Sequence, residues 1–461
     1  MSSPTVQLIS ECFIKPYPPP EEFKQPFYLT PSDLAMLSAH YIQKGLLFAK
    51  PPQATNQVGN GFMEILLDRL KNSLSLTLVH FYPLAGRLKT IKGENPPSYS
   101  VYVDCNDSPG AKFIYANLDM TASDILSQTY VPPFVQSFFD HHKAVNHDGH
   151  TMSLLSIQVT ELVDGVFIGC SMNHCLGDGT SYWNFFNSWS EIFQAKGDSI
   201  STGATSISRP PILKRWFPEG HGPIINLPYT HPEQFISRFE AADLKERIFH
   251  FSADSIAKLK AKANAERNVT NEISSLQSLS ALVWRCITRV RNLPPDQATS
   301  CRLAANNRSR LDPPISDNYF GNSIYALRGF TTAGELLEHD LGWAAWKVHQ
   351  AVTDYDDKAI REFLDSWLQS PYVFQIGQLF DPYSVMMGSS PRFNKYGSEF
   401  GMGKALALRS GYAHKFDGKV SCYPGREGGG SIDLEMCLLP DTMCALENDT
   451  EFMEAAGLTS S

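Results

Sequence analysis

Signals that direct a chain into or across a membrane are absent from this sequence. No run approaches the roughly 18 consecutive apolar residues of a membrane span. The first residues lack the basic and apolar regions of a secretory signal. The nine cysteines are scattered, and none form a CxxC pair. We therefore expect reduced thiols in a monomeric cytoplasmic protein with no membrane contact.

Positive charge is also scarce. The formal net charge of −9 argues against a nucleic-acid partner, because a surface that follows phosphates needs a basic excess. The sequence has no GxSxG elbow, P-loop or GxGxxG motif, so it lacks the usual signatures of serine hydrolases and of nucleotide-binding folds. No histidine and cysteine cluster has zinc spacing, and the four histidines in 141–150 are expected in a solvated loop. We expect no metal.

What is present indicates a large globular chain. The 461 residues, 43% of them hydrophobic, fit two domains rather than one core. Leucines at helical spacing predict a helix over 62–78. Two β-rich runs, 154–160 and 166–172, flank Asp164-Gly165 and predict a hairpin. Strands and helices then alternate on both sides of a segment rich in Gly, Ser and Pro, which favours α/β or α+β domains. We divide the chain into a first domain, a crossover and a second domain, at 1–195, 196–240 and 241–461.

His174 is the first candidate for chemistry. It follows an apolar strand in the pattern HxxxDG, where Gly177 and Gly179 permit a tight turn. An imidazole at such a strand exit can act as a general base, although an isolated histidine is more often structural. A second HxxxD pattern starts at His250 and is interpreted as chance. Asp178 could complete a triad, but an aspartate before a helix is ordinarily an N-cap.

Two glycine-rich segments are further candidates. Residues 397–408 place Gly397, Gly401 and Gly403 around Phe400 and Met402, which by itself indicates a turn entering a strand. Residues 423–439 place a glycine-rich turn before an alternating strand. Such a turn could bind phosphate, but a hairpin is the simpler interpretation.

The chain resembles the plant BAHD acyltransferases over essentially its whole length. The resemblance rests on HCLGDG, EFGMGK, YFGN, NNRSRLDPP and HFYPLAGRL, which occur in the family's order and spacing. It implies an α/β (α+β) fold of two chloramphenicol-acetyltransferase-like domains, each a mixed sheet with covering helices, joined by a long crossover loop. A tunnel between them would admit acyl-CoA from one side and the acceptor from the other.

The resemblance also implies roles for single residues. His174 matches the catalytic histidine, and Asp178 the aspartate that pairs with an arginine, here Arg308. Ser274 and Ser275 open the helix that approaches CoA phosphates. The box Glu399, Phe400, Gly401, Met402 and Gly403 departs from the family at Glu399, usually Asp, and at Met402, usually Trp. Because methionine has no donor, we expect a substitute oxyanion donor from the tunnel wall, Tyr41 first and Gln43 second. Tyr41 could equally pack on the acceptor pocket, with Met402 widening the site near the thioester.

These expectations combine into one function. The chain is expected to transfer an acyl group from acyl-CoA, a co-substrate rather than a bound cofactor, to a hydroxyl rather than an amine of a small plant metabolite. His174 would deprotonate the acceptor in a ternary complex, because no activated nucleophile is visible. The alternatives are the same fold repurposed for an elimination, and a non-catalytic small-molecule binder.

Overall fold

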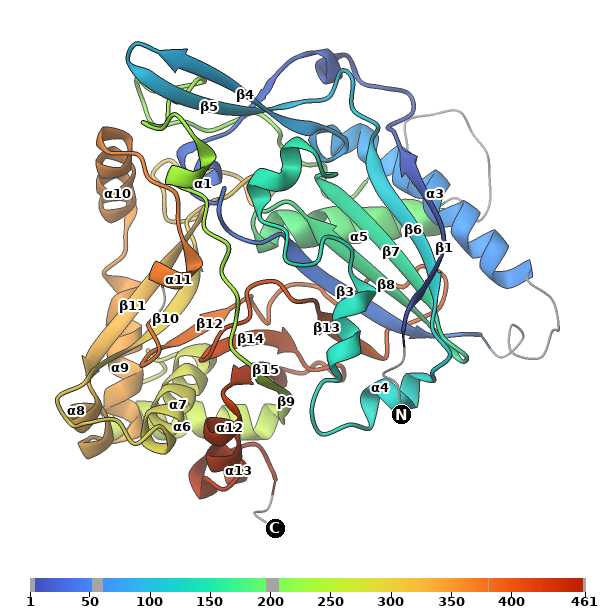
Figure 1. The fold of residues 1–461 in the computed structure, drawn as a ribbon. Coiled ribbons are helices and arrows are strands. Elements are labelled where there is room, and N and C mark those ends of the chain that lie inside the picture. Colours follow the sequence, from blue (N-terminus) through green and yellow to red (C-terminus); the bar gives the residue numbers. More distant parts are fainter. Residues whose placement is uncertain (1–4, 52–60, 196–206, 380, 459–461) are drawn as a thin grey trace.

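Two six-stranded sheets form the body of the protein (Figure 1). The computed structural model describes residues 5–51, 61–195, 207–379 and 381–458. The first sheet has the order β1 (Gln7–Ile14), β6 (Ala111–Asn117), β7 (Leu155–Glu161), β8 (Gly165–Met172), β3 (Ile42–Ala49), β13 (Ala407–Ser410). The second has the order β11 (Ile324–Thr332), β10 (Ala298–Asn306), β12 (Val385–Gly388), β14 (Lys419–Pro424), β15 (Ile432–Leu438), β9 (Lys245–Phe251). Each sheet contains parallel and antiparallel pairs, which confirms the mixed-sheet expectation.

A small sheet and the helices complete the fold. The three-stranded sheet has the order β2 (Phe27–Tyr28), β5 (Pro97–Asp104), β4 (Arg87–Glu94). The α-helices are α1 (Pro31–Leu34), α3 (Gly61–His80), α4 (Ala122–Leu126), α5 (Gly179–Ala195), α6 (Ala253–Glu266), α7 (Ser275–Val290), α8 (Ala333–Glu338), α9 (Leu341–Thr353), α10 (Asp357–Gln369), α11 (Ile376–Leu379), α12 (Pro440–Leu446) and α13 (Thr450–Ala455). The short 3-10 helices are η1 (Glu21–Lys24), η2 (Tyr82–Ala85), η3 (Pro133–Phe138), η4 (Asn146–His150) and η5 (Pro232–Gln234). No helix in these ranges is both long and apolar enough to cross a bilayer.

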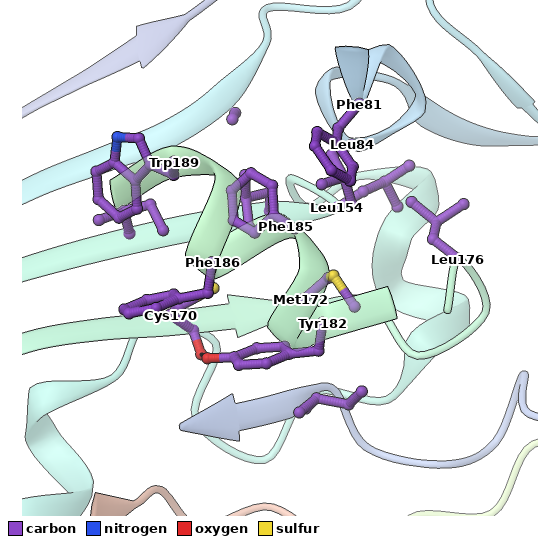
Figure 2. Packing of buried hydrophobic residues seen from close by; sticks show 14 of the residues in the cluster. Phe81, Leu84, Leu154, Cys170, Met172, Leu176, Tyr182, Phe185, Phe186 and Trp189 are labelled. Atoms are coloured by element: carbon purple, nitrogen blue, oxygen red, sulfur yellow. Dashed lines mark hydrogen bonds between the residues drawn. The ribbon is translucent and has the colours of Figure 1, made fainter. Parts of the chain in front are cut away.

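Helices α3 and α5 cover the first sheet, and α6, α7 and α9 form a layer on the second. The aromatic residues of α5 pack onto β8, and every residue of β8 is buried. Figure 2 shows this core, in which the Phe185 ring also meets Phe81, with centroids 5.5 Å apart. The Tyr182 hydroxyl donates to the carbonyl of Lys44 on β3 at 2.7 Å and lies 3.3 Å from that of Cys170 on β8, which ties α5 to both strands. Burying one such aromatic side chain stabilises the fold by about 1.5–3 kcal/mol, so α5 fixes the end of β8.

Several locally encoded elements are confirmed. The helix predicted over 62–78 is α3, and the predicted hairpin is β7 and β8, paired antiparallel across Asp164-Gly165. The segment 423–439 is the end of β14 and its hairpin partner β15, as the simpler interpretation had it.

The crossover segment is irregular apart from η5 over residues 207–240, and residues 196–206 lie outside the described ranges. It makes short bridges to both halves, pairing Leu227 with Tyr99 and Ile212 with Tyr319. The domain limits remain a prediction. The structure adds that β13, from the second half of the sequence, pairs with β3 in the first sheet.

Candidate active site

His174 lies in the turn between β8 and α5. Its backbone N–H donates to Asn146 Oδ1 at 2.7 Å, and its ring Nδ1 is 3.1 Å from Asn322 Oδ1. The amide nitrogen of Asn322 donates to the His174 carbonyl at 2.7 Å and to Asp33 Oδ1 at 2.9 Å. Because both amide hydrogens are used, Asn322 Oδ1 accepts and Nδ1 of His174 carries the proton. The other ring nitrogen, Nε2, therefore keeps a lone pair, as a general base requires.

A buried carboxylate holds Asn322 in place. Asp33 Oδ1 accepts from the backbone N–H of Asn322 at 3.0 Å as well as from its side chain. Asp33 Oδ2 accepts from the N–H and hydroxyl of Thr30 and pairs with Arg215, which belongs to the crossover segment. None of these residues was predicted. The YFGN motif at 319–322 is the signal that could have indicated Asn322.

Asp178 and Arg308 form a fully buried ion pair, as the resemblance implied. Arg308 Nη1 donates to Oδ2 at 2.7 Å and Nη2 donates to Oδ1 at 3.2 Å. The same carboxylate accepts from two backbone N–H groups in the first turn of α5, the N-cap interaction, and from that of Ser323. The ring Nδ1 of His174 is held by Asn322 instead, so the geometry does not favour a triad with Asp178.

Both motif glycines allow close packing at this turn. A Cβ at Gly177 would lie 2.5 Å from the Cβ of Ser181, and one at Gly179 would lie 3.0 Å from the Phe393 ring. The first distance is shorter than real Cβ contacts, and the second would require the Phe393 ring to shift. Larger residues at these positions would therefore displace the turn that carries His174.

The electrostatic surroundings keep His174 neutral near pH 7. Burial lowers its pKa below the ordinary value, and the nearby Asp178 charge and the Asn322 hydrogen bond only partly oppose this. The adjacent thiol of Cys175 is also buried, and burial raises its pKa well above the usual range. A thiol in this state is a poor nucleophile, so the imidazole is the better candidate for chemistry at this turn.

Two further histidines lie beside His174, and neither was predicted. The His414 ring centroid is 5.7 Å from that of His174 and 5.6 Å from that of His40. His414 has a φ of 60°, in the left-handed region, and its buried Nε2 has no hydrogen-bond partner within the described ranges. Burial lowers the pKa of His40 to about 4 and that of His414 well below the usual value. Both rings are therefore neutral at pH 7.

The expectation of a solvated loop at 141–150 is wrong. His141 is buried and its Nε2 lies 2.9 Å from the hydroxyl and the carbonyl of Ser153. Asn146 is fully buried and holds the backbone of His174. The segment packs because its polar groups find partners inside the protein. Across the described ranges no three His, Cys, Asp or Glu side chains are grouped to hold a metal ion.

The glycine-rich box lies at the far end of α5 from His174. The backbone N–H of Glu399 donates to Ser190 Oγ at 3.0 Å, and Phe400 packs on Trp189 with ring centroids 4.7 Å apart. Gly401 and Gly403 have φ values of 71° and 76°, and half-buried Met402 packs on the first core. The helical rise places Ser190 roughly 16 Å along the axis from the first residue of α5. This separation does not support an influence of Met402 on the thioester.

The two expected oxyanion donors lie inside the first domain. Tyr41 is buried with its ring against His141, and its hydroxyl has no hydrogen bond of normal geometry in the described part of the chain. Gln43 donates to the Asp140 carbonyl at 2.8 Å and to Ser171 Oγ at 3.3 Å. Its amide hydrogens are thus already used, and the arrangement favours a structural role for Gln43.

The remaining predicted positions, Ser274 and Ser275, and His250 of the second HxxxD pattern lie on other elements than the turn of His174. Ser274 is the N-cap of α7 and Ser275 its first residue, and both keep part of their surface exposed. His250 lies on β9 and pairs with Asp433 at 2.7 Å and with Glu427 at 3.1 Å. His250 is therefore held by contacts with carboxylates at the surface, consistent with a chance HxxxD pattern.

Comparisons with known proteins identify the family. The model of the Transferase family matches residues 5–453. An uncharacterized acetyltransferase of Arabidopsis thaliana is 36% identical, covering 98% of this chain and 99% of that protein. The BAHD acyltransferase DCR of the same plant is 33% identical, covering 97% and 92%. The chain belongs to the BAHD acyltransferase family.

The fold of this BAHD acyltransferase matches solved structures. Vinorine synthase superposes with a TM-score of 0.70 at 20% identity, over 99% of each chain. A TRI101 structure from F. sporotrichioides, complexed with coenzyme A and T-2, gives a TM-score of 0.70 at 15% identity, over 93% of this chain and 98% of that one. At such low identity these superpositions support the fold alone. They confirm the expected fold class of two chloramphenicol-acetyltransferase-like domains.

Proposed function

We propose that this acyltransferase moves an acyl group from a CoA thioester to a hydroxyl of a small plant metabolite, with His174 as the general base. The hydrogen bond between His174 Nδ1 and Asn322 Oδ1 carries the proposal. It leaves Nε2 unprotonated, and burial keeps the ring neutral at physiological pH. A histidine with a merely structural role would not need one nitrogen kept free in this way.

The proposed reaction proceeds in a ternary complex. Nε2 of His174 takes the proton from the acceptor hydroxyl while its oxygen attacks the thioester carbonyl. The tetrahedral intermediate collapses with cleavage of the carbon–sulfur bond, and the imidazolium returns its proton to the leaving thiolate. The buried, protonated Cys175 does not favour an acyl-enzyme.

Binding of the acyl donor is proposed at the start of α7. The exposed N–H groups of a helix N-terminus favour phosphate, and Ser274 and Ser275 supply hydroxyls there. The monomeric state and the cytoplasmic location remain predictions.

Replacement of His174 tests the base. His174→Ala should lower turnover by roughly 10²–10⁴, the usual contribution of a general base, with little change in acyl-CoA affinity. His250→Ala is the matched control, because it removes a histidine from the same HxxxD pattern at the protein surface. Steady-state kinetics on both variants decides the matter, since equal losses would refute the assignment.

The pH profile gives a second test of the same base. A pKa below the ordinary 6.5 means that the acid limb of kcat/KM should fall below about pH 6.5. Activity should therefore be flat from pH 7 to 8 and decline only on acidification. An acid limb above pH 7 would contradict the arrangement described here.

The two alternative functions, an elimination and simple binding, need a separate test. An elimination on a substrate without CoA, or simple binding, would release no CoA thiol. A panel of acyl-CoAs with pooled acceptors should release thiol only when an acceptor is present. Thiol release in no combination would favour one of the alternatives.

A further inference from the structure

Basic side chains gather between the two sheets. Lys44, on β3 of the first sheet, reaches the Tyr423 hydroxyl on β14 of the second at 2.5 Å and Glu435 on β15 at 4.0 Å. Ser410 on β13 donates to Glu435 at 2.5 Å, so the two sheets meet here through polar groups. We call the following group the basic cluster: Lys44, Lys395, Arg409, Lys415 and Lys419, with the carboxylates Glu246 and Glu435.

The basic cluster has more basic side chains than carboxylates, although burial lowers the pKa of Lys395 well below its usual value. Its five basic side chains face the two carboxylates, although the whole chain carries a formal charge of −9. Glu246 pairs with Lys415, and Glu435 lies nearest the charge of Lys44. Lys395 is held by the Ser389 hydroxyl and a carbonyl, which are not charged. Cys422, Cys437 and Tyr423 complete the surroundings, and burial raises the pKa of each, so they add no negative charge.

Lys419 is the side chain left without a partner. Its Nζ forms no hydrogen bond or ion pair with any part of the chain that the structure describes. The amine lies over the bare backbone of Gly388, where a Cβ would overlap it. Burial, and then the nearby charge of Lys44, lowers the pKa of Lys419 to about 8, so the amine is still mostly charged at pH 7. Partial burial of a cation without a counter-ion has a desolvation cost, which a bound anion would offset.

The basic cluster adjoins the loop that carries His414, because the Ala413 N–H donates to Gln43 Oε1, next to Lys44, and Lys415 follows His414 in the chain. Lys419 and Lys44 both lower the pKa of His414, whose ring is 5.7 Å from that of His174. Lys419 and Lys44 also keep part of their side chains accessible to solvent. His414 thus contacts His174 and also feels the charge of the two lysines.

We propose that Lys419, assisted by Lys44, binds a carboxylate carried by the small substrate, either on the acyl group or on the acceptor. This inference rests on the proposed function. The phosphates of CoA do not fit the position, because the pantetheine arm separates them from the thioester that must lie beside His174. A carboxylate a few bonds from the reacting centre does fit, and its charge would offset that of the unpaired amine.

Binding measurements on His174→Ala protein test the acyl arm without turnover. Calorimetry with malonyl-CoA and acetyl-CoA should show that the carboxylated donor binds about tenfold more tightly, the effect of one hydrogen bond to a charged group. Lys419→Met should remove that preference and leave acetyl-CoA affinity unchanged. Lys258→Met, at an exposed lysine on α6, is the control and should retain it.

The second arm of the experiment tests whether the acceptor carries the carboxylate. Pooled hydroxy acids and their methyl esters are incubated with the protein, and the compounds that it retains are identified by affinity selection and mass spectrometry. If the acceptor carries the carboxylate, free acids should be retained over esters by the wild type and not by Lys419→Met. The melting temperature of Lys419→Met should equal or exceed that of the wild type, because an uncompensated charge is removed, so lost binding would not reflect misfolding.

Three results would overturn the inference. The first is the absence of a carboxylate preference in both arms, and the second is a preference that survives Lys419→Met. The third is an equal loss of acetyl-CoA and malonyl-CoA affinity in Lys419→Met, which would mean that the amine binds the CoA moiety. Full turnover by His174→Ala would instead refute the proposed base and leave this binding test intact.

Discussion

At the scale of single residues, the feature that matters most is the amide of Asn322. Its oxygen selects the tautomer of His174, and its nitrogen anchors to Asp33. An amide performs this task without adding a charge beside the imidazole. The ring therefore stays neutral, whereas a carboxylate in that place would favour the imidazolium.

Asn322→Ala should lower kcat by roughly 10–10², because the ring of His174 loses the contact that orients it. KM for the acyl donor should change little. Asn318→Ala is the control and should keep full activity, because this half-buried asparagine of the same loop accepts from Arg209 and not from the His174 turn. Unchanged kcat in Asn322→Ala would show that the tautomer is set by another group.

The sequence could indicate His174 but not its support. The histidine, the two glycines and Asp178 lie within six consecutive residues, so a local pattern reveals them. Asn322 is 148 positions away from His174 and Arg215 is 182 positions away from Asp33. Such contacts depend on how the halves of the chain come together. No local spacing in one sequence specifies that.

At the scale of elements, α5 links the candidate site to the core. Its first turn is capped by Asp178, whose charge is balanced by Arg308 from beyond β10. Its far end holds the glycine-rich box through Ser190 and Phe400. The HxxxDG turn and the glycine-rich box therefore contact the same helix at opposite ends.

Removal of one partner of the buried pair should be strongly destabilising. Arg308→Met should lower the free energy of unfolding by about 3–5 kcal/mol, because the Asp178 carboxylate is left buried without its counter-charge. The double variant Asp178→Asn with Arg308→Met should recover part of that loss. Urea unfolding of the single and double variants measures the coupling. Purely additive losses would mean that the two charges do not stabilise each other.

The box should matter for stability more than for chemistry. Phe400 is fully buried, and Phe400→Ala should cost about 3–5 kcal/mol of unfolding free energy. Met402→Ala, at a half-buried neighbour, should cost less and leave turnover near that of the wild type. Thermal unfolding and steady-state kinetics on both variants check this. A hundredfold loss of turnover in Met402→Ala would restore the expected role beside the thioester.

Elements differed in how far the sequence could predict them. The α3 helix and the β7–β8 hairpin carry their own periodicity and turn residues, so they could be predicted locally. β13 has only four residues and pairs with β3, more than 350 positions earlier in the chain. A strand so short has no clear pattern, and its partner depends on tertiary packing.

At the scale of the whole molecule, β13 joins the two halves. The chain leaves the second sheet after β12, adds β13 to the first sheet, and returns to the second as β14. Unfolding of either sheet would therefore disturb the segment that runs from β12 through β13 to β14. The crossover adds a second link, because Arg215 pairs with Asp33 in the first half and donates to the Phe320 carbonyl in the second. The halves should behave as one cooperative unit even though each has its own core.

Cooperative unfolding is the last prediction. Amide hydrogens of β8 and of β14 should lose protection at the same urea concentration, because opening either sheet removes the strand and the ion pair that connect them. Leu408→Ala, at a buried residue of β13, should lower the free energy of unfolding by about 2–5 kcal/mol. The urea midpoints of β8 and β14 should therefore fall together. Leu126→Ala, at a partly exposed leucine of α4, should move neither much. The prediction fails if β8 and β14 open at separate urea concentrations, or if Leu408→Ala weakens the first sheet alone. The two halves would then be independent, and the basic cluster between them would form when two folded bodies dock.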